Sequence, residues 1–272
     1  MTDMKVLFTD LDGTLLNKKS SVTEYTRNIL KEFTDQGNMV VPCSGRPLLS
    51  MQKLLESEGL SDITGYIIAY NGALVWDCAA DKPVWESGIA IDTAYTIQNE
   101  CITHGIHIQT YADEHIVTLT GDTEIDYYKK KIFLPVIFAD DPVSVCKRPP
   151  YKLLAIDLKD HDKLCKLKDD LAGKIGDEVN AVFSNPYYLE FFNMEAGKSN
   201  GMLELCRHLD IDIADTIAVG DEENDISMIE AAGTGIAVAN ATDRVKASAD
   251  VVTEADNDND ALAGYLAERI LL

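Results

Sequence analysis

The fold is decided by residues 5–14, which read Lys-Val-Leu-Phe-Thr-Asp-Leu-Asp-Gly-Thr. The apolar part of this stretch is continuous rather than alternating, as is typical of a strand in a parallel sheet that is covered on both faces. Asp10 and Asp12 follow the strand directly, at the edge where open α/β sheets bind their ligands. Two negative charges this close together are costly unless a cation or a shared proton offsets them. An ordinary Asp-Gly turn or a fragment of a calcium-binding loop is the alternative interpretation.

Helices and strands are predicted to alternate on both sides of the insertion described below. The apolar spacing predicts helices at 23–36, 48–57, 198–209, 223–232 and 258–272. Strands are predicted at 39–42, 66–69, 216–219, 235–238 and 250–252, with a hairpin at 74–76 and 84–85. Strands that alternate with helices imply βαβ units and therefore a parallel sheet.

The pattern changes in the middle of the chain. Helices are predicted there at 93–104 and 160–174, and short strands at 106–111, 116–119, 151–158 and 179–184. Helices that are segregated from several strands indicate an α+β module. We therefore predict an α/β fold with a doubly wound, mainly parallel sheet. Residues 1–86 and 190–272 are expected to form its core, and residues 87–189 an inserted domain.

The composition favours a folded protein and argues against some partners. Of the 272 residues, 46% are hydrophobic, which is enough for a sizeable core. The net charge of −22 argues against nucleic acid and against an anionic membrane surface. The six cysteines are scattered without metal-type spacing, as expected in the cytoplasm, and no apolar run is long enough to span a membrane. The oligomeric state is not indicated by these features.

A second acidic segment, Gly-Asp-Glu-Glu-Asn-Asp at residues 220–225, follows the strand predicted at 216–219. It repeats the arrangement of the first motif, an apolar strand that ends in carboxylates. Alone, it would be interpreted as a turn and a helix N-cap. Together with the first motif, it favours a metal site, in which Asp10, Asp12 and Asp221 offer the oxygen ligands that Mg²⁺ prefers.

Two further segments contain groups suited to a phosphate. Ser44 and Gly45 lie between a predicted strand and a predicted helix, where a hydroxyl and main-chain N–H groups can bind a phosphate oxygen. A simple helix cap explains these two residues equally well. Lys198, at the start of a predicted helix, is positioned to neutralise a phosphoryl group, although an isolated lysine is usually a solvated surface charge.

These segments together resemble the haloacid dehalogenase-like (HAD) superfamily of phosphotransferases and, within it, the Cof-type phosphatases. The resemblance extends over essentially the whole chain, because four short motifs occur in the same order and at compatible spacing. It implies that Asp10 is a nucleophile and that Asp12 is a general acid and base. It also implies that Asp12 reaches the metal through its main-chain carbonyl. The insertion looks like the family's larger α/β (C2B-type) cap.

The resemblance also implies which groups surround the phosphoryl group. The expected phosphate-binding residues are Leu11 (through its main-chain N–H), Ser44, Gly45, Lys198 and Asn224. The expected supporting residues beside them are Asp225, Arg46 and Asn71.

The implied function is Mg²⁺-dependent hydrolysis of small phosphorylated metabolites, such as sugar phosphates or similar phosphomonoesters, through an aspartyl-phosphate. The cap would select the substrate by closing over the site. Its basic side chains fit surface or packing roles better than substrate contacts: His104, His107, His115, Lys147, Arg148 and Lys152. The alternatives are a phosphosugar mutase, a receiver-type signalling domain and a phosphometabolite-binding protein without activity.

Overall fold

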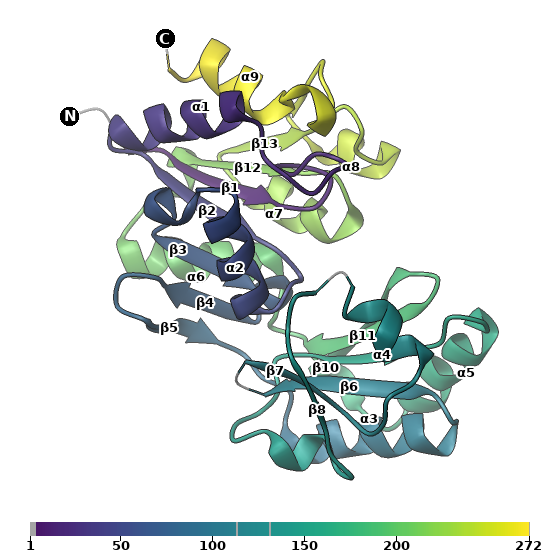
Figure 1. The fold of residues 1–272 in the computed structure, drawn as a ribbon. Helices are drawn as coiled ribbons and strands as arrows, with labels where there is room; N and C mark the ends of the chain where they lie inside the picture. Colours follow the sequence, from purple (N-terminus) through teal and green to yellow (C-terminus); the bar gives the residue numbers. More distant parts are fainter. Residues whose placement is uncertain (1–3, 113, 131, 272) are drawn as a thin grey trace. The chain divides into compact units, whose positions relative to one another are not determined.

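The computed structural model describes residues 4–112, 114–130 and 132–271. The chain divides into two compact units. The first, here called the core unit, consists of Met1–Trp85 and Gly197–Leu272, and the second, the inserted unit, of Glu86–Ala196. Figure 1 shows the elements of each unit.

The core unit is built on a sheet of eight strands in the order β14-β13-β12-β1-β2-β3-β4-β5. The strands are β1 (Val6–Asp10), β2 (Met39–Cys43), β3 (Tyr66–Ala69), β4 (Leu74–Asp77), β5 (Lys82–Glu86), β12 (Thr216–Gly220), β13 (Thr234–Ala237) and β14 (Val251–Val252). Strands from β14 to β3 run parallel, and β4 is antiparallel to β3. Successive strands are added on one side of β1 and then on the other, so the strand order switches between β1 and β12. The predicted doubly wound, mainly parallel sheet is confirmed, and such a switch point is where ligands bind.

Helices pack on the core sheet, and their cover is the reason that its strands are apolar. They are α1 (Glu24–Asp35), α2 (Leu48–Ser57), α6 (Lys198–Leu209), α7 (Ile226–Ala231), α8 (Asp243–Ser248) and α9 (Ala261–Arg269). Helix α1 lies beside α9, and α6 beside α7 (Figure 1). Val6 and Phe8 of β1 pack with Met202 of α6, while all five residues of β1 are buried. A strand covered on both faces needs no polar alternation, which is the reason for the continuous apolar run.

Two core helices begin later than the apolar spacing predicts. The predicted helix 223–232 opens with a 3₁₀ turn, Glu223–Asp225, before α7. The predicted helix 258–272 is interrupted at Asp260, which adopts a left-handed conformation with φ 57°, so α9 begins at Ala261. A residue in this conformation cannot continue a right-handed helix.

The inserted unit has a sheet of six strands in the order β10-β11-β9-β6-β7-β8. Its strands are β6 (His107–Ala112), β7 (His115–Thr118), β8 (Val136–Phe138), β9 (Leu153–Ile156), β10 (Val179–Asn185) and β11 (Tyr188–Asn193), and its helices are α3 (Ile91–Thr103), α4 (Thr123–Tyr128) and α5 (His161–Ala172). Apolar residues of α3 and α5 form one buried cluster with Leu153 and Phe191 of the sheet. Elements β8, β11 and α4 were not predicted. The expected boundary at 189/190 lies inside β11, which pairs with both β10 and β9, so the inserted unit continues to Ala196.

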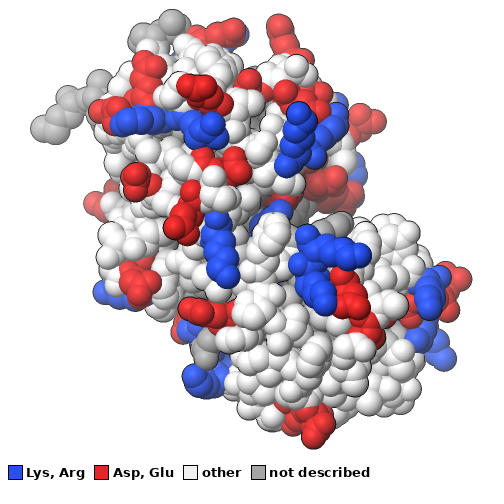
Figure 2. Space-filling view, viewed as in Figure 1, with Lys and Arg blue, Asp and Glu red and all other residues white. Residues whose placement is uncertain are grey.

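Figure 2 shows the charged side chains on one face of the molecule. On the face drawn in Figure 2, acidic and basic side chains are interspersed, and the described Lys and Arg residues seen there do not form a continuous basic band. In the part of the chain that the structure describes, no helix combines the length and the apolar character needed to cross a bilayer.

Candidate active site

The register of the core sheet brings the first and last acidic motifs to one edge. Strands β1 and β12 are parallel neighbours, with Thr9 opposite Val219, so Asp10 and Asp221 leave the sheet side by side. Both residues are buried, each with an exposed fraction of 7%. The carboxylates of Asp10, Asp221 and Asp225 offer oxygens that all lie within 4.8 Å of one another. The sheet thus gathers three carboxylates at its switch point.

Lys198 supplies a buried cation to this carboxylate cluster. The residue is the first of α6, and its side chain is fully buried. Its Nζ donates to Asp10 Oδ1 at 2.5 Å and to Asp225 Oδ1 at 2.6 Å. Removing a charge from water is costly unless it is paired and hydrogen-bonded, and both conditions are met here. The predicted lysine is therefore part of the site and not a surface charge.

Asp225 links the cluster to the main chain of its own loop. Its Oδ2 accepts hydrogen bonds from the N–H groups of Asp221 (3.0 Å) and Glu222 (3.1 Å), while Oδ1 accepts from Lys198. Both oxygens are thus already engaged. Asp225 orients Lys198 and fixes the loop that carries Asp221.

The pKa values of these groups indicate an excess of negative charge in the carboxylate cluster. Burial raises the pKa of Asp10 well above its usual range; Lys198 opposes this rise, and Asp225 and Asp221 add to it. Burial also raises the pKa of Asp221 to about 6, although the Thr14 hydroxyl lowers it in part. Burial alone would lower the pKa of Lys198, but Asp10 and Asp225 raise it, so this side chain stays protonated. Three carboxylates facing one ammonium group call for a further cation.

The residues present fit a divalent metal ion. Hard cations such as Mg²⁺ take carboxylate oxygens together with water and substrate phosphate. Asp221 Oδ2 accepts no hydrogen bond from a described residue and is a suitable donor, and Asp10 Oδ1, which accepts from Lys198, has a second lone pair to offer. The carboxylate of Asp12, expected in the metal set, is not part of the cluster. Its main-chain carbonyl is the group of Asp12 that the resemblance assigns to the metal.

Asp12 instead pairs with Arg46. Arg46 Nε donates to Asp12 Oδ2 at 2.7 Å, and Nη2 donates to Oδ1 at 2.6 Å. The Asp12 side chain is 51% exposed, whereas that of Arg46 is 13% exposed. Leu11, between the two aspartates, has a fully buried side chain that anchors this loop in the core.

The loop after β2 carries the expected phosphate-binding residues. Ser44 follows Cys43, which lies opposite Asp10 in the sheet, and its side chain is buried. The Ser44 hydroxyl accepts from the N–H of Arg46 at 3.2 Å, and its carbonyl accepts from the N–H of Asn71 at 3.0 Å. A Cβ on Gly45 would lie 2.9 Å from Asn71 Oδ1, so only glycine fits against that side chain. Asn71 therefore packs against this loop and fixes its main chain.

Asn71 also connects this loop to the last motif. Its Oδ1 accepts from Asn224 Nδ2 at 3.1 Å. The turn Tyr70-Asn71-Gly72 has three successive residues with positive φ, of 53°, 55° and 91°. Such a conformation costs free energy for residues other than glycine and persists only where surrounding contacts hold it. Asn71 therefore connects the loop of Ser44 to the loop of Asn224.

Thr14 is a site residue to which the sequence pattern assigned no role. Its Oγ1 donates to Asp221 Oδ1 at 2.7 Å, and the contact is buried. The signal available was the position of a hydroxyl directly after Gly13 in the first motif. Only the pairing of β1 with β12 shows that this hydroxyl meets a carboxylate more than 200 residues away.

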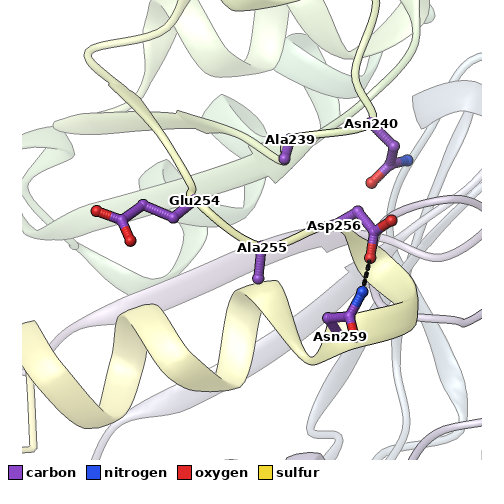
Figure 3. A pocket seen from close by; sticks show the side chains of 6 residues that line it. All are labelled: Ala239, Asn240, Glu254, Ala255, Asp256 and Asn259. Carbon is purple, nitrogen blue, oxygen red and sulfur yellow. Dashed lines mark hydrogen bonds between the residues drawn. The ribbon is translucent and has the colours of Figure 1, made fainter.

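A separate pocket of about 520 Å³ lies in the core unit, beyond the ends of β13 and β14 (Figure 3). The residues lining it are Ala239, Asn240, Glu254, Ala255, Asp256 and Asn259. Asn259 donates to Asp256, and Asn240 donates to the carbonyl of Gly13 at 2.7 Å. The pocket contains no member of the carboxylate cluster, and Asn240, which lines it, supports the loop of the first motif through its bond to Gly13.

Adding one methyl group at Gly72, by substitution with alanine, should destabilise the core unit more than most additions of this size. A Cβ there would lie 2.0 Å from the carbonyl oxygen of Gly197, the residue before Lys198. We expect Gly72→Ala to lower the free energy of unfolding by about 3 kcal/mol or more, from backbone strain plus the clash. Gly37→Ala is the matched control, because Gly37 has a similar φ of 89° and nothing within 4 Å of its Cβ position; about 1 kcal/mol is expected there. Equal losses in urea unfolding would contradict the close approach.

Comparisons with known proteins agree with this geometry. The sequence profile of the haloacid dehalogenase-like hydrolases matches residues 7–266. The chain is 30% identical over 258 residues to the putative phosphatase YxeH of Bacillus subtilis, with 94% of each chain covered. It is 27% identical over 292 residues to the 5-amino-6-(5-phospho-D-ribitylamino)uracil phosphatase YwtE of the same organism, with 98% of each covered. A solved haloacid dehalogenase-like hydrolase from Bacteroides thetaiotaomicron matches with a TM-score of 0.91 at 27% identity, covering 98% of this chain and 99% of that one.

The chain therefore belongs to the haloacid dehalogenase-like hydrolases, and the resemblance in its motifs is confirmed. Within that family it is an enzyme of the phosphatase type, acting on phosphorylated substrates.

Proposed function

We propose that this enzyme is a Mg²⁺-dependent phosphatase that hydrolyses small phosphorylated metabolites, such as sugar phosphates or related phosphomonoesters, through an aspartyl-phosphate on Asp10. The observation that carries the proposal is the state of Asp10: one carboxylate oxygen is held by Lys198, and the other has no hydrogen bond to a described residue. A carboxylate held in this way is oriented as a nucleophile. The name of YwtE, a phosphatase of a phosphorylated ribityl compound, supports a small phosphorylated substrate.

In the first half of the reaction, Asp10 Oδ2 forms a bond to phosphorus while the bond from phosphorus to the leaving oxygen breaks. Asp12, as a carboxylic acid, gives its proton to that leaving oxygen. In the second half, Asp12 takes a proton from water while the water oxygen bonds to phosphorus and the Asp10–phosphorus bond breaks. A positioned acid and base of this kind contributes about 10²- to 10⁴-fold.

The remaining residues bind and orient. Lys198 and the Ser44 hydroxyl would balance charge on the transferring group, together with the main-chain N–H groups of Leu11 and Gly45 and the amide of Asn224. Mg²⁺ held by Asp10, Asp221 and the main-chain carbonyl of Asp12 would offset the carboxylate charge and polarise the phosphoryl group.

The inserted unit is proposed to be the cap that selects the substrate, and residues 1–85 and 197–272 the catalytic core. Closure of a cap excludes water and contacts the leaving group. The six cysteines are all free thiols, which supports a reducing compartment such as the cytoplasm.

The first test is release of inorganic phosphate from p-nitrophenyl phosphate and from a panel of sugar and cofactor phosphates, with Mg²⁺ and with EDTA. Metal-dependent release is expected. Transfer of the phosphoryl group to a second sugar hydroxyl without phosphate release would indicate a mutase instead. Metal binding without turnover of any compound would overturn the enzymatic proposal in favour of a binding or receiver-type protein.

Stability should also depend on pH and metal through Asp221. Because its pKa is raised from 3.8 to about 6, the folded state binds this proton more tightly than the unfolded state does. For this group, the free energy of unfolding of the metal-free protein therefore falls as pH rises from 3.8 to about 6 and stays lowered above that. We expect Mg²⁺ to raise the unfolding temperature strongly at pH 8 and weakly at pH 5.

The variant Asp221→Asn should lose most of the Mg²⁺-dependent rise at pH 8, while its metal-free form should be at least as stable as the metal-free wild type. Asp35→Asn, on the exposed face of α1, serves as the control and should keep the full rise. Thermal unfolding with Mg²⁺ or EDTA measures both. An unchanged Mg²⁺ effect in Asp221→Asn would show that the metal is held elsewhere.

A further inference from the structure

Arg46 donates hydrogen bonds to both oxygens of the Asp12 carboxylate, the group that transfers a proton in the proposed function. The two hydrogen bonds, Nε to Oδ2 at 2.7 Å and Nη2 to Oδ1 at 2.6 Å, form a bidentate pair. Such pairs between a guanidinium and a carboxylate have fixed geometry and are stronger than neutral hydrogen bonds. Asp12 is therefore held in one defined position in the free enzyme.

Arg46 is the better anchored member of this pair. Its main-chain N–H donates to the Ser44 hydroxyl, and its carbonyl accepts from the N–H of Tyr70 at 3.0 Å. Its side chain is 13% exposed, against 51% for that of Asp12. Movement within the pair is thus expected mainly at Asp12, on the loop that follows β1.

The paired arrangement restricts the proton-transfer step. A general acid needs a carboxyl oxygen that carries a proton and reaches the leaving oxygen. Each oxygen of Asp12 accepts one hydrogen bond from Arg46, so a proton has to sit on a lone pair that Arg46 does not use. Opening one of the two bonds frees an oxygen to turn toward the leaving group.

We propose that Arg46 is a positioning residue that holds Asp12 in a waiting arrangement and, by one retained hydrogen bond, aims its freed oxygen at the leaving group. This inference rests on the proposed function. It adds that the efficiency of leaving-group protonation depends on Arg46, a residue to which the expected mechanism gives no chemical step. When one bond opens, the freed oxygen of protonated Asp12 gives its proton to the leaving oxygen as the phosphorus–oxygen bond breaks, and Asp12 becomes a carboxylate.

The test compares two leaving groups in single turnovers with enzyme in excess. Release of p-nitrophenolate needs no proton, whereas release of an alcohol from a sugar phosphate does. In Arg46→Gln, we expect alcohol release to slow by about tenfold or more, because small errors in positioning are costly, and p-nitrophenolate release to change by less than about threefold. Arg46→Lys, which keeps one donor, should recover part of the alcohol rate.

Two controls separate the possible failures. Asp12→Asn should show the same selective loss, and more strongly; if it does not, the proposed role of Asp12 fails and this inference with it. Arg244→Gln removes another arginine–carboxylate contact, with Glu223 at 2.7 Å, and should leave the ratio of the two rates unchanged. If Asp12→Asn is selective while Arg46→Gln slows both substrates equally, or neither, the positioning role of Arg46 is overturned and the proposed function stands.

Discussion

Asp10→Asn should abolish turnover while leaving the fold intact. Asparagine keeps the size of the side chain but cannot attack phosphorus as a carboxylate, so no aspartyl-phosphate can form. We expect phosphate release to fall by about 10⁴-fold or more, as when a catalytic nucleophile is removed from other enzymes. Steady-state assay with the best substrate of the panel measures the loss, and intact-protein mass spectrometry after a rapid acid quench measures the absence of a phosphorylated form.

The same variant should not be destabilised in the absence of metal. Burial and the neighbouring carboxylates raise the pKa of Asp10, so its ionised form costs stability at neutral pH, and the amide removes that cost. The unfolding temperature in EDTA is expected to be unchanged or higher. Asp215→Asn, at the opposite end of β12 where Asp215 pairs with Lys5, is the matched control and should retain activity within about twofold. Residual activity of Asp10→Asn close to that of this control would refute the role of Asp10.

Lys198→Met should remove both activity and a large part of the stability. The ammonium group lies between Asp10 and Asp225 with its side chain fully buried, and methionine would leave two buried carboxylates without their cation. Breaking a buried ion pair from one side typically costs about 3–5 kcal/mol, and we expect a loss of this size at pH 7 in urea unfolding. The folded fraction of the variant should also lose turnover, because the nucleophile Asp10 loses its orienting partner.

The pH dependence of this variant distinguishes charge from packing. The pKa of Lys198 is raised above 10.5, so its stabilising charge is fully present below that pH and its loss is felt across the neutral range. Without the lysine, the carboxylates can relieve their repulsion by taking up protons, so the destabilisation should shrink as pH falls from 7 to 5. Lys31→Met, which removes an exposed pair with Asp35 on α1, should change stability by less than about 0.5 kcal/mol at any pH. A Lys198→Met deficit that does not vary with pH would point to packing alone.

The core of the fold could be predicted because its signals are local. The continuous apolar residues of β1, followed by Asp10, and the similar run of β12, followed by Asp221, imply neighbouring parallel strands and hence a shared edge. The strand β11 was not predicted because it lies at the expected boundary of the insertion. Its place in the sheet is set by pairing with β10 and β9, which has no local signature.

Sequence reasoning anticipated which residues lie together at the sheet edge better than it anticipated their contacts. Lys198 and Asp221 lie with Asp10 as expected, because the ends of parallel strands and the start of a following helix converge. The partner of Asp12 was not predictable, since its carboxylate turns to Arg46 while that of Asp225 joins the buried cluster. Residues two positions apart after a strand end can face different surroundings, and their loop geometry decides between them.

The sequence by itself determined the class of fold, the order of the motifs and the chemical groups at the end of each strand, because periodicity and strand ends depend on residues near one another in the chain. Only the tertiary structure decided which hydrogen-bond donor meets which acceptor. Thr14 reaches Asp221, Asn71 reaches Asn224, and Arg46 reaches Asp12 across separations of 34 to 207 residues. Contacts of this kind depend on the register of the sheet and on loop conformation, which strand pairing and packing establish together.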